Sequence, residues 1–285
     1  MKTIVLTGAT SGIGKEVALQ LLLLGHRVIA NARDLDKARQ AASELQGKSG
    51  SNKLLFIKAD LQDFNSVKNF AAAIGSESSS VDVLINNAGT WEMEFSRTKD
   101  GIETNLQVNH LSPMLLTLEL LPMLEKSGNG RIINTSSMAH RRNICDFDDI
   151  EWLRKPYDGV ATYSQSKLFN LLFSLHLKNR LFHMKTTVNT VHPGYVRTQL
   201  FNKMGVRNWD GIPDAAHGAR SALFAALNPK LEGISGKYIY LENEENGISS
   251  LAKDEALAEK LWDVSMKYIS GYLTKRIDES FLQYS

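Results

Sequence analysis

The sequence has very little cysteine and almost no net charge. Cys145 is the single cysteine in 285 residues, so neither an internal disulfide nor a cysteine-rich metal site can form. The 33 Lys and Arg residues exceed the 31 Asp and Glu residues by only two, and no stretch combines dense basic residues with aromatic ones. This composition lacks the electrostatic signature of a nucleic-acid-binding protein.

Long apolar runs are also missing. The run Ile4–Leu6 is too short for a signal peptide, and Leu21–Leu24 falls far below the roughly 20 residues that cross a bilayer. We therefore expect a cytoplasmic protein without an integral membrane anchor. The histidines show no metal-ligand spacing with acids or cysteines, so we expect no metal.

Short β-branched segments alternate with longer helical patterns. We expect strands over residues 3–6, 27–32, 53–58, 81–86, 131–135, 187–191 and 237–240. We expect helices over 13–24, 35–45, 66–74, 162–182, 215–227 and 251–268, a proline-interrupted helical region over 100–126, and a polar loop over 75–80. This alternation predicts one doubly wound α/β (Rossmann) domain over 1–285, with helices on both faces of a parallel sheet of about seven strands.

A glycine turn follows the first predicted strand. In TGATSGIG, glycines allow a close backbone approach, and the N-terminus of the next helix can bind a pyrophosphate. A purely structural turn is the alternative, because glycines mark any tight turn. Position after the first strand favours a dinucleotide, bound by Gly8, Thr10, Ser11, Gly12, Ile13 and Gly14.

The end of the second predicted strand bears on which dinucleotide binds. A carboxylate there would bind the 2′-hydroxyl of NAD, whereas an arginine can pair with a 2′-phosphate. The chain has Arg33 there and no acid until Asp34. A solvated arginine paired with Asp34 is the alternative, and we favour NADP(H).

Tyr163 and Lys167 are four residues apart, so a helix places them on one face. A nearby ammonium favours the phenolate, which makes a tyrosine a usable acid or base. Such a pair also arises by chance on solvated helices. Ser136 and Ser137 directly after an apolar strand and Asn109 within an apolar helix make chance a weaker explanation, although Asn109 could simply be a satisfied core residue.

These motifs together resemble the short-chain dehydrogenase/reductase family over essentially the whole chain. The motifs are TGATSGIG at 7–14, Asp60-Leu61, NNAG at 86–89, Asn109, Ser137, YSQSK at 163–167 and HPGYVRT at 192–198. The resemblance implies that Tyr163 exchanges the proton and that Ser137 binds the substrate oxygen. It further implies that Lys167 holds the nicotinamide ribose and lowers the Tyr163 pKa, while Asn109 holds a water. The implied cofactor contacts also include Asp60, Leu61, Asn87, Ala88, Gly89, Pro193, Gly194, Val196 and Thr198.

Ser137 and Tyr163 are 26 residues apart, about twice the family's usual gap. This insertion resembles the retinol-dehydrogenase-like branch, together with protochlorophyllide reductase and WW-domain oxidoreductases. We expect substrate-lid elements around 140–160 and 198–214. These elements carry large apolar side chains that either line an apolar substrate pocket or simply pack the lid against the domain. The side chains are Trp152, Tyr157, Tyr195, Phe201, Met204 and Trp209.

The sequence thus predicts an NADP(H)-dependent oxidoreductase that moves hydride between nicotinamide and a carbonyl or alcohol carbon of a small hydrophobic substrate. A C=C (enone-type) reductase and a catalytically silent NADPH-binding scaffold are the alternatives. The resemblance also implies a homodimer or homotetramer, built partly on the helices around 100–126 and 161–182.

Overall fold

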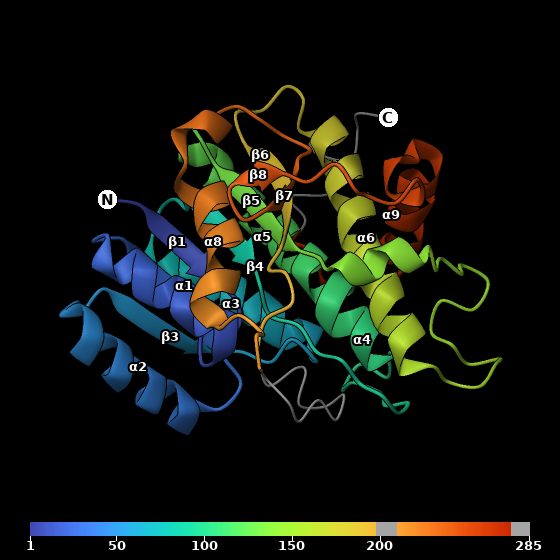
Figure 1. The fold of residues 1–285 in the computed structure, drawn as a ribbon, viewed down its shortest axis with the longest axis horizontal. Helices are drawn as coiled ribbons and strands as arrows, with labels where there is room; N and C mark the ends of the chain where they lie inside the picture. The colour runs from blue at the N-terminus through green and yellow to red at the C-terminus, as the bar shows by residue number, and fades with distance from the viewer. Residues whose placement is uncertain (198–209, 275–285) are drawn as a thin grey trace.

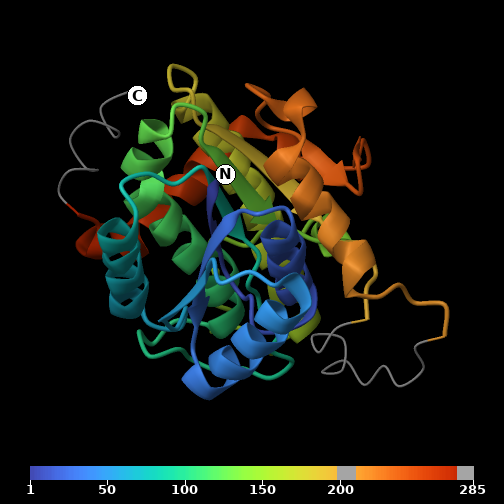
Figure 2. The ribbon, with the colours of Figure 1, turned by 90° about the vertical axis from the view of Figure 1, so that its left-hand side faces the viewer.

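The computed structural model describes residues 1–197 and 210–274. In this part of the chain, helices cover both faces of a central sheet (Figures 1 and 2). The strands are β1 (Thr3–Leu6), β2 (Arg27–Ala32), β3 (Leu54–Lys58), β4 (Val83–Asn86), β5 (Arg131–Thr135), β6 (Thr187–His192), β7 (Tyr238–Tyr240) and β8 (Asn243–Glu244).

The α-helices are α1 (Gly12–Leu23), α2 (Leu35–Ser49), α3 (Phe64–Glu77), α4 (Thr104–Leu106), α5 (Ser112–Lys126), α6 (Gly159–Arg180), α8 (Ala215–Leu227) and α9 (Glu255–Ile269). Between α4 and α5 lies a π-helical segment, η1 (Gln107–Leu111). Short 3₁₀ turns are η2 (Met138–Arg142), η3 (Pro229–Leu231), η4 (Leu251–Lys253) and η5 (Ser270–Tyr272).

The strand order is β3-β2-β1-β4-β5-β6-β7-β8. Strands β1 to β7 pair in parallel, as predicted, and only β8 is antiparallel to its neighbour. The two-residue β8 was not predicted because it is too short to show a periodic pattern. Successive strands are added on one side of β1 up to β3 and on the other side from β4 onwards, so the strand order reverses between β1 and β4. Doubly wound sheets bind ligands at the carboxyl ends of the strands beside such a switch point.

Side chains of one strand alternate between two hydrophobic cores. Ile4 and Leu6 pack with residues of α1 and α8, whereas Val5 faces the core shared by α3, α5 and α6. Both sheet faces are covered, which is why the strands appear in the sequence as continuous apolar runs. No helix in the described ranges is both long and apolar enough to cross a membrane.

Aspartates fix where most of the long helices begin. Asp34, Asp63, Asp158, Asp214 and Asp254 each accept a hydrogen bond from a backbone N–H in the first turn of α2, α3, α6, α8 and α9 respectively. The last of these caps explains why the helix expected over 251–268 is divided into η4 and α9.

Several predicted boundaries were wrong. Helix α2 continues to Ser49 rather than ending at 45, and α6 spans Gly159–Arg180 rather than 162–182. The loop expected over 75–80 begins only after α3, which continues through Gly75 to Glu77, and the Ser76 hydroxyl donates to the Ala72 carbonyl oxygen at 3.5 Å in its last turn. The region expected over 100–126 is divided by η1, and Pro113 lies in the first turn of α5 rather than breaking it, where its missing N–H costs nothing. Pro122 lies inside α5.

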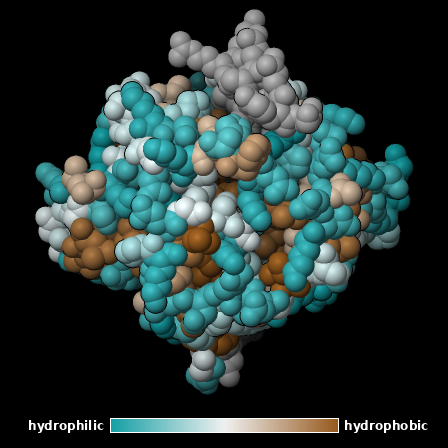
Figure 3. All heavy atoms as spheres, turned by 90° about the horizontal axis from the view of Figure 1, so that it is seen from above, coloured by the Kyte–Doolittle hydropathy of each residue, from teal (hydrophilic) through white to brown (hydrophobic). Residues whose placement is uncertain are grey.

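Helix α9 covers part of α6 on the right of Figure 1. Trp262 of α9 is 3% exposed, and its ring stacks on Phe173 and packs against His176 of α6. An assembly built on the helix around 161–182, as the resemblance implied, would therefore meet a helix that α9 already covers in part. The assembly itself stays a prediction. On the face shown in Figure 3, hydrophobic residues lie in separate groups among hydrophilic ones, as on ordinary protein surface.

Candidate active site

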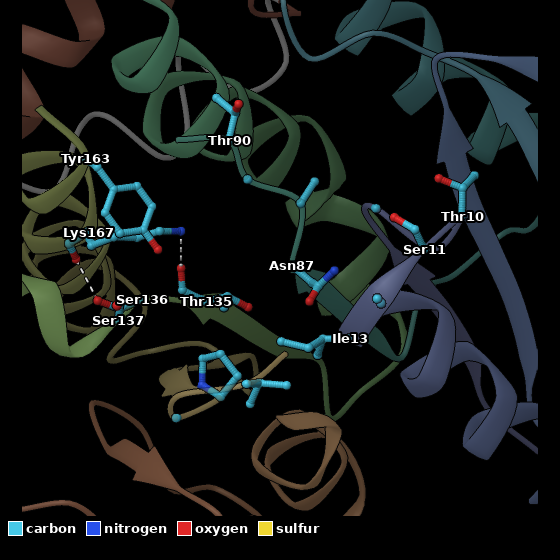
Figure 4. Close-up of a pocket in the computed structure, with 18 of the residues that line it drawn as sticks. Thr10, Ser11, Ile13, Asn87, Thr90, Thr135, Ser136, Ser137, Tyr163 and Lys167 are labelled. Carbon is cyan, nitrogen blue, oxygen red and sulfur yellow. Dashed lines mark hydrogen bonds between the residues drawn. The ribbon is translucent and has the colours of Figure 1, made fainter. Parts of the chain in front are cut away.

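A cavity of about 390 Å³ opens at the carboxyl ends of the central strands. Tyr163 and Lys167 approach it from α6, across from the glycine turn that follows β1 (Figure 4). Its lining consists of Gly8, Thr10, Ser11, Gly12, Ile13, Gly14, Arg33, Asn87, Ala88, Gly89, Thr90, Thr135, Ser136, Ser137, Tyr163, Lys167, Pro193, Gly194 and Val196.

A second cavity of about 600 Å³ continues from the glycine turn past Arg33 to Asp60 and Leu61. Together the two cavities form one groove, since Gly8 and Arg33 line both. Every predicted cofactor residue in the described part of the chain lines this groove. Thr198 lies outside the described residues.

The glycine turn is packed too tightly for side chains. Gly8 has a φ of +76°, a conformation that favours glycine. A Cβ on Gly14 would lie 2.1 Å from the Gly8 carbonyl oxygen. The turn is also anchored from both sides, because Asn31 Oδ1 accepts the Gly8 N–H at 3.0 Å and Asn87 Nδ2 donates to the Thr7 carbonyl at 2.9 Å.

The N-terminus of α1 offers donors that fit a dinucleotide phosphate. Ser11 at the N-cap makes no side-chain capping bond, and the first turn holds no acidic residue. Backbone N–H groups and the positive end of the helix dipole therefore face the groove. With Arg33 at one end and Lys167 at the other, the groove suits an anionic dinucleotide.

Asp34 interacts electrostatically with Arg33, but its carboxylate is also engaged at the start of α2. Its carboxylate caps α2 by accepting the N–H groups of Asp36 and Lys37, which holds its pKa below the usual value. Arg33 is exposed at the rim of both cavities. The guanidinium is thus available to an anionic group in the groove.

The Tyr163–Lys167 pair projects from one face of α6, and both side chains are buried. Lys167 Nζ lies 5.5 Å from the Tyr163 ring centroid and donates to the Thr135 carbonyl oxygen at 3.1 Å. Burial lowers the pKa of Lys167 to about 8. The ammonium is therefore held at the end of β5, where it lines the groove and can interact with an anionic group there.

The protonation of Tyr163 differs from the expectation of a lowered pKa. Burial raises the pKa of the phenol to about 12, and a hydrogen bond with Ser137 acts in the opposite direction. Desolvation outweighs this hydrogen bond, because a buried phenolate loses its hydration. The phenol is consequently protonated at neutral pH.

The two adjacent serines have different partners. Ser136 is 1% exposed, and its hydroxyl donates to the Lys167 carbonyl oxygen at 2.7 Å (Figure 4). The Ser137 side chain caps η2 by accepting the Ala139 N–H at 3.3 Å and interacts with Tyr163. Ser136 thus fixes the helix that carries the pair, and Ser137 is the serine placed beside the phenol.

Asn109 does not line either cavity, but it contacts Thr90, which does. Its Oδ1 accepts the Thr90 N–H at 2.7 Å, and its Nδ2 donates to the Thr90 carbonyl at 2.9 Å and to Ser166 Oγ at 3.0 Å. A Cβ on Gly89 would lie 3.1 Å from Asn109 Oδ1 and 3.4 Å from Lys167 Nζ. The side chain therefore holds the loop after β4, and its expected role in holding a water stays a prediction.

The expected lid side chains are spread apart. Trp152 lies under the Lys155 ammonium, Tyr157 joins a hydrogen-bond cluster at the start of α6, and Tyr195 is 53% exposed. None of these three lines the two cavities. Phe201, Met204 and Trp209 lie outside the described residues, and the lid as a whole stays a prediction.

Sequence reasoning missed three residues near Tyr163 and Lys167. Thr90 and Thr135 line the first cavity, and Trp91 stacks on Tyr163. Thr90 directly follows NNAG and Thr135 ends a predicted strand, so the strand ends themselves were the available signal. Ser136, which the sequence placed beside Ser137 but without a role, also lines this cavity. Trp91 lies two residues beyond NNAG and carries no periodic signal.

The sequence matches the short chain dehydrogenase family over residues 2–208. Human retinol dehydrogenase 14 is 36% identical, and the alignment covers 93% of this chain and 85% of that protein. A crystal structure of an uncharacterised Mycobacterium paratuberculosis protein is 34% identical with a TM-score of 0.79, covering 95% of this chain and 94% of the other. A Sphingobium yanoikuyae short-chain dehydrogenase solved with NADPH is 26% identical with a TM-score of 0.63, covering 78% and 83%.

The chain therefore belongs to the short-chain dehydrogenases, a family of oxidoreductases that bind a nicotinamide cofactor. Within that family it belongs to the retinol-dehydrogenase-like branch.

Proposed function

We propose that the protein is an NADP(H)-dependent oxidoreductase that interconverts a carbonyl and an alcohol on a small hydrophobic substrate. The observation that carries this proposal is the single groove that contains Arg33, the uncapped start of α1 and the Tyr163–Lys167 pair. A cytoplasmic location belongs to the same proposal.

When bound, the nicotinamide supplies hydride for reduction or accepts it in oxidation. In reduction, the Tyr163 hydroxyl donates its proton to the substrate oxygen, and Ser137 positions that oxygen with a hydrogen bond. The raised pKa of Tyr163, about 12, keeps the proton on the phenol before transfer. Lys167 stabilises the phenolate that results, because an opposite charge nearby favours the ionised form.

Arg33 supports NADP(H) over NAD(H). Its planar guanidinium can form two parallel hydrogen bonds with a 2′-phosphate at the rim of the groove. The NADPH complex of the Sphingobium relative agrees with this assignment. The hydrophobic substrate class draws its support from the relatives named as retinol dehydrogenases.

The test is Tyr163→Phe, assayed with NADPH and a panel of retinal, a medium-chain aldehyde and an aromatic ketone. We expect turnover to fall by at least about 100-fold, the usual contribution of general acid catalysis, while NADPH affinity stays within about twofold. Full turnover in this variant would contradict the mechanism. Wild-type protein that binds NADPH but reduces nothing in the panel would favour the silent scaffold, and an enone reduced at C=C would favour the other alternative.

A further inference from the structure

The indole of Trp91 lies flat against the phenol ring of Tyr163. Their centroids are 4.1 Å apart and their planes differ by 4°. Trp91 is 6% exposed and Tyr163 is 5% exposed, so the contact is nearly dry. Trp91 Nε1 also donates to the Gly159 carbonyl oxygen at 2.9 Å. The indole is therefore tied to the first turn of the helix that carries Tyr163.

Two asparagine side chains hold the residues on either side of Trp91. Asn109 binds both backbone groups of Thr90, as described above. Asn105 binds Glu92 in the same way: its Oδ1 accepts the Glu92 N–H at 2.9 Å, and its Nδ2 donates to the Glu92 carbonyl oxygen at 3.2 Å. Both amides are buried, so each pairing persists without competition from water. The backbone that flanks Trp91 is thus fixed at both ends.

Gly159 allows this segment to approach α6. A Cβ at position 159 would lie 2.4 Å from the Glu92 carbonyl oxygen and 2.5 Å from Met93 Cα. Backbone atoms cannot yield to such a contact as a flexible side chain can. The absence of a side chain at Gly159 is therefore a second, independent feature that lets Trp91 reach Tyr163.

We propose that Trp91 is a positioning residue for Tyr163, which fixes the plane of the phenol ring and keeps the phenol protonated until a substrate oxygen accepts the proton. This inference rests on the proposed function, in which Tyr163 exchanges that proton. The face of an indole carries the negative part of its quadrupole, so a phenolate stacked on it is disfavoured. The indole also keeps water from that face of the ring, which removes the hydration that would stabilise the anion.

Other ionisable groups act on the same phenol. Lys167 lies on the same helix, Tyr238 of β7 interacts electrostatically with Tyr163, and His140 of η2 contacts Ser137. Lys167 favours the phenolate, whereas Trp91 disfavours it. Because an indole does not titrate, its effect is the same at every pH and can be separated by substitution.

The experiment compares Trp91→Leu, which removes the aromatic face, with Trp91→Phe, which keeps a flat ring but loses the Nε1–H bond. The first readout needs no substrate: tyrosinate absorbance is titrated in each variant, with and without an added Tyr163→Phe change, and the difference isolates Tyr163. In Trp91→Leu we expect its titration to move about half to one pH unit lower, as the energy of an aromatic pair implies. Trp91→Phe should stay close to wild type.

The second readout is reduction of a medium-chain aldehyde with NADPH. We expect kcat of Trp91→Leu to fall about three- to tenfold and the alkaline limb of its pH profile to move lower, with KM for NADPH within about twofold. Trp262→Leu, which removes a buried indole that lines neither cavity, should shift neither the Tyr163 titration nor the alkaline limb of the pH profile. If Trp91→Leu does not fold, Trp91→Met gives the same comparison with an unbranched side chain.

An unchanged Tyr163 titration in Trp91→Leu overturns the inference, as does an equal shift in Trp262→Leu. The proposed function fails separately, if Tyr163→Phe retains full turnover. The absorbance titration remains informative in that case, because it does not depend on catalysis.

Discussion

His140 Nδ1 lies 2.6 Å from the carbonyl oxygen of Ser137. The other ring nitrogen, Nε2, accepts the Ser249 N–H at 3.2 Å, so the proton is on Nδ1 and the imidazole is neutral. Burial lowers the pKa of His140, which favours this neutral form. The imidazole therefore ties the backbone of the serine beside Tyr163 to the segment before η4.

Removing the hydrogen bond between His140 Nδ1 and the Ser137 carbonyl oxygen should impair the chemical step more than cofactor binding. We expect His140→Phe to lower kcat about fivefold to tenfold, the value of one lost hydrogen bond, with little change in NADPH affinity. His140→Asn places an amide donor near the Nδ1 position and should recover part of the loss. Steady-state kinetics of the two variants decide this, and equal activity in both would contradict a role for the Nδ1 proton.

Replacing Arg33 with Asp should reverse the preference between cofactors. Loss of charge-assisted bonds to a 2′-phosphate weakens NADPH binding by about tenfold to a hundredfold, whereas the new carboxylate can accept the 2′-hydroxyl of NADH. Fluorescence titration with each cofactor measures both affinities. Lys48→Asp, on the exposed end of α2, serves as the charge-matched control. Parallel changes in the two affinities would show that Arg33 does not contact the phosphate.

The glycine turn should not tolerate a methyl group at position 14. Because the new Cβ would meet the Gly8 carbonyl oxygen at 2.1 Å, Gly14→Ala must shift the turn, and we expect NADPH binding to be lost. Gly75→Ala is the matched control on an open helix surface. It should raise the free energy of unfolding by about 0.5–1 kcal/mol and leave NADPH binding unchanged. Normal NADPH binding by Gly14→Ala would show that the turn adapts.

Buried neutral histidines should make the fold sensitive to acid. Burial lowers the pKa of His110 to about 3 and that of His192 to about 4, from 6.5. Below pH 6.5 the unfolded chain binds more protons than the folded one, so each histidine lowers the free energy of unfolding as the pH falls toward 4. The loss per histidine is about 3 kcal/mol by pH 4.

Urea denaturation at several pH values measures this slope. His110→Gln should unfold more easily at neutral pH but show a flatter dependence between pH 6.5 and 4. The control is His183→Gln, because His183 is exposed. An unchanged slope in His110→Gln would contradict the assignment.

Most of the fold was predictable because its signals are local. Strands such as β1 and β5 are buried on both faces, so their apolar runs define them without any knowledge of neighbours. Their parallel arrangement follows from the alternation with helices. The π-helical η1 was not predictable, since an i→i+5 turn leaves no distinct periodicity in a stretch as apolar as 106–124.

The site was predictable where residues follow a strand or share a helix face. Arg33 and Ser137 follow β2 and β5, and Tyr163 and Lys167 are one turn apart. The protonation of Tyr163 was not predictable, because it depends on how completely the fold buries the phenol. Trp91 was missed for a related reason: its position depends on the contact of Asn105 with Glu92, 13 residues apart, and on its own bond to Gly159, 68 residues further along the chain.

The covering of α6 by α9 affects the order in which the molecule becomes complete. The helix that carries Tyr163 precedes its partner α9 in the chain, so α6 is synthesised before Trp262 is available to pack on it. Until α9 is in place, Phe173 and His176 lack their contacts with Trp262. The helix that carries Tyr163 therefore gains its full packing only when this later segment has folded onto it.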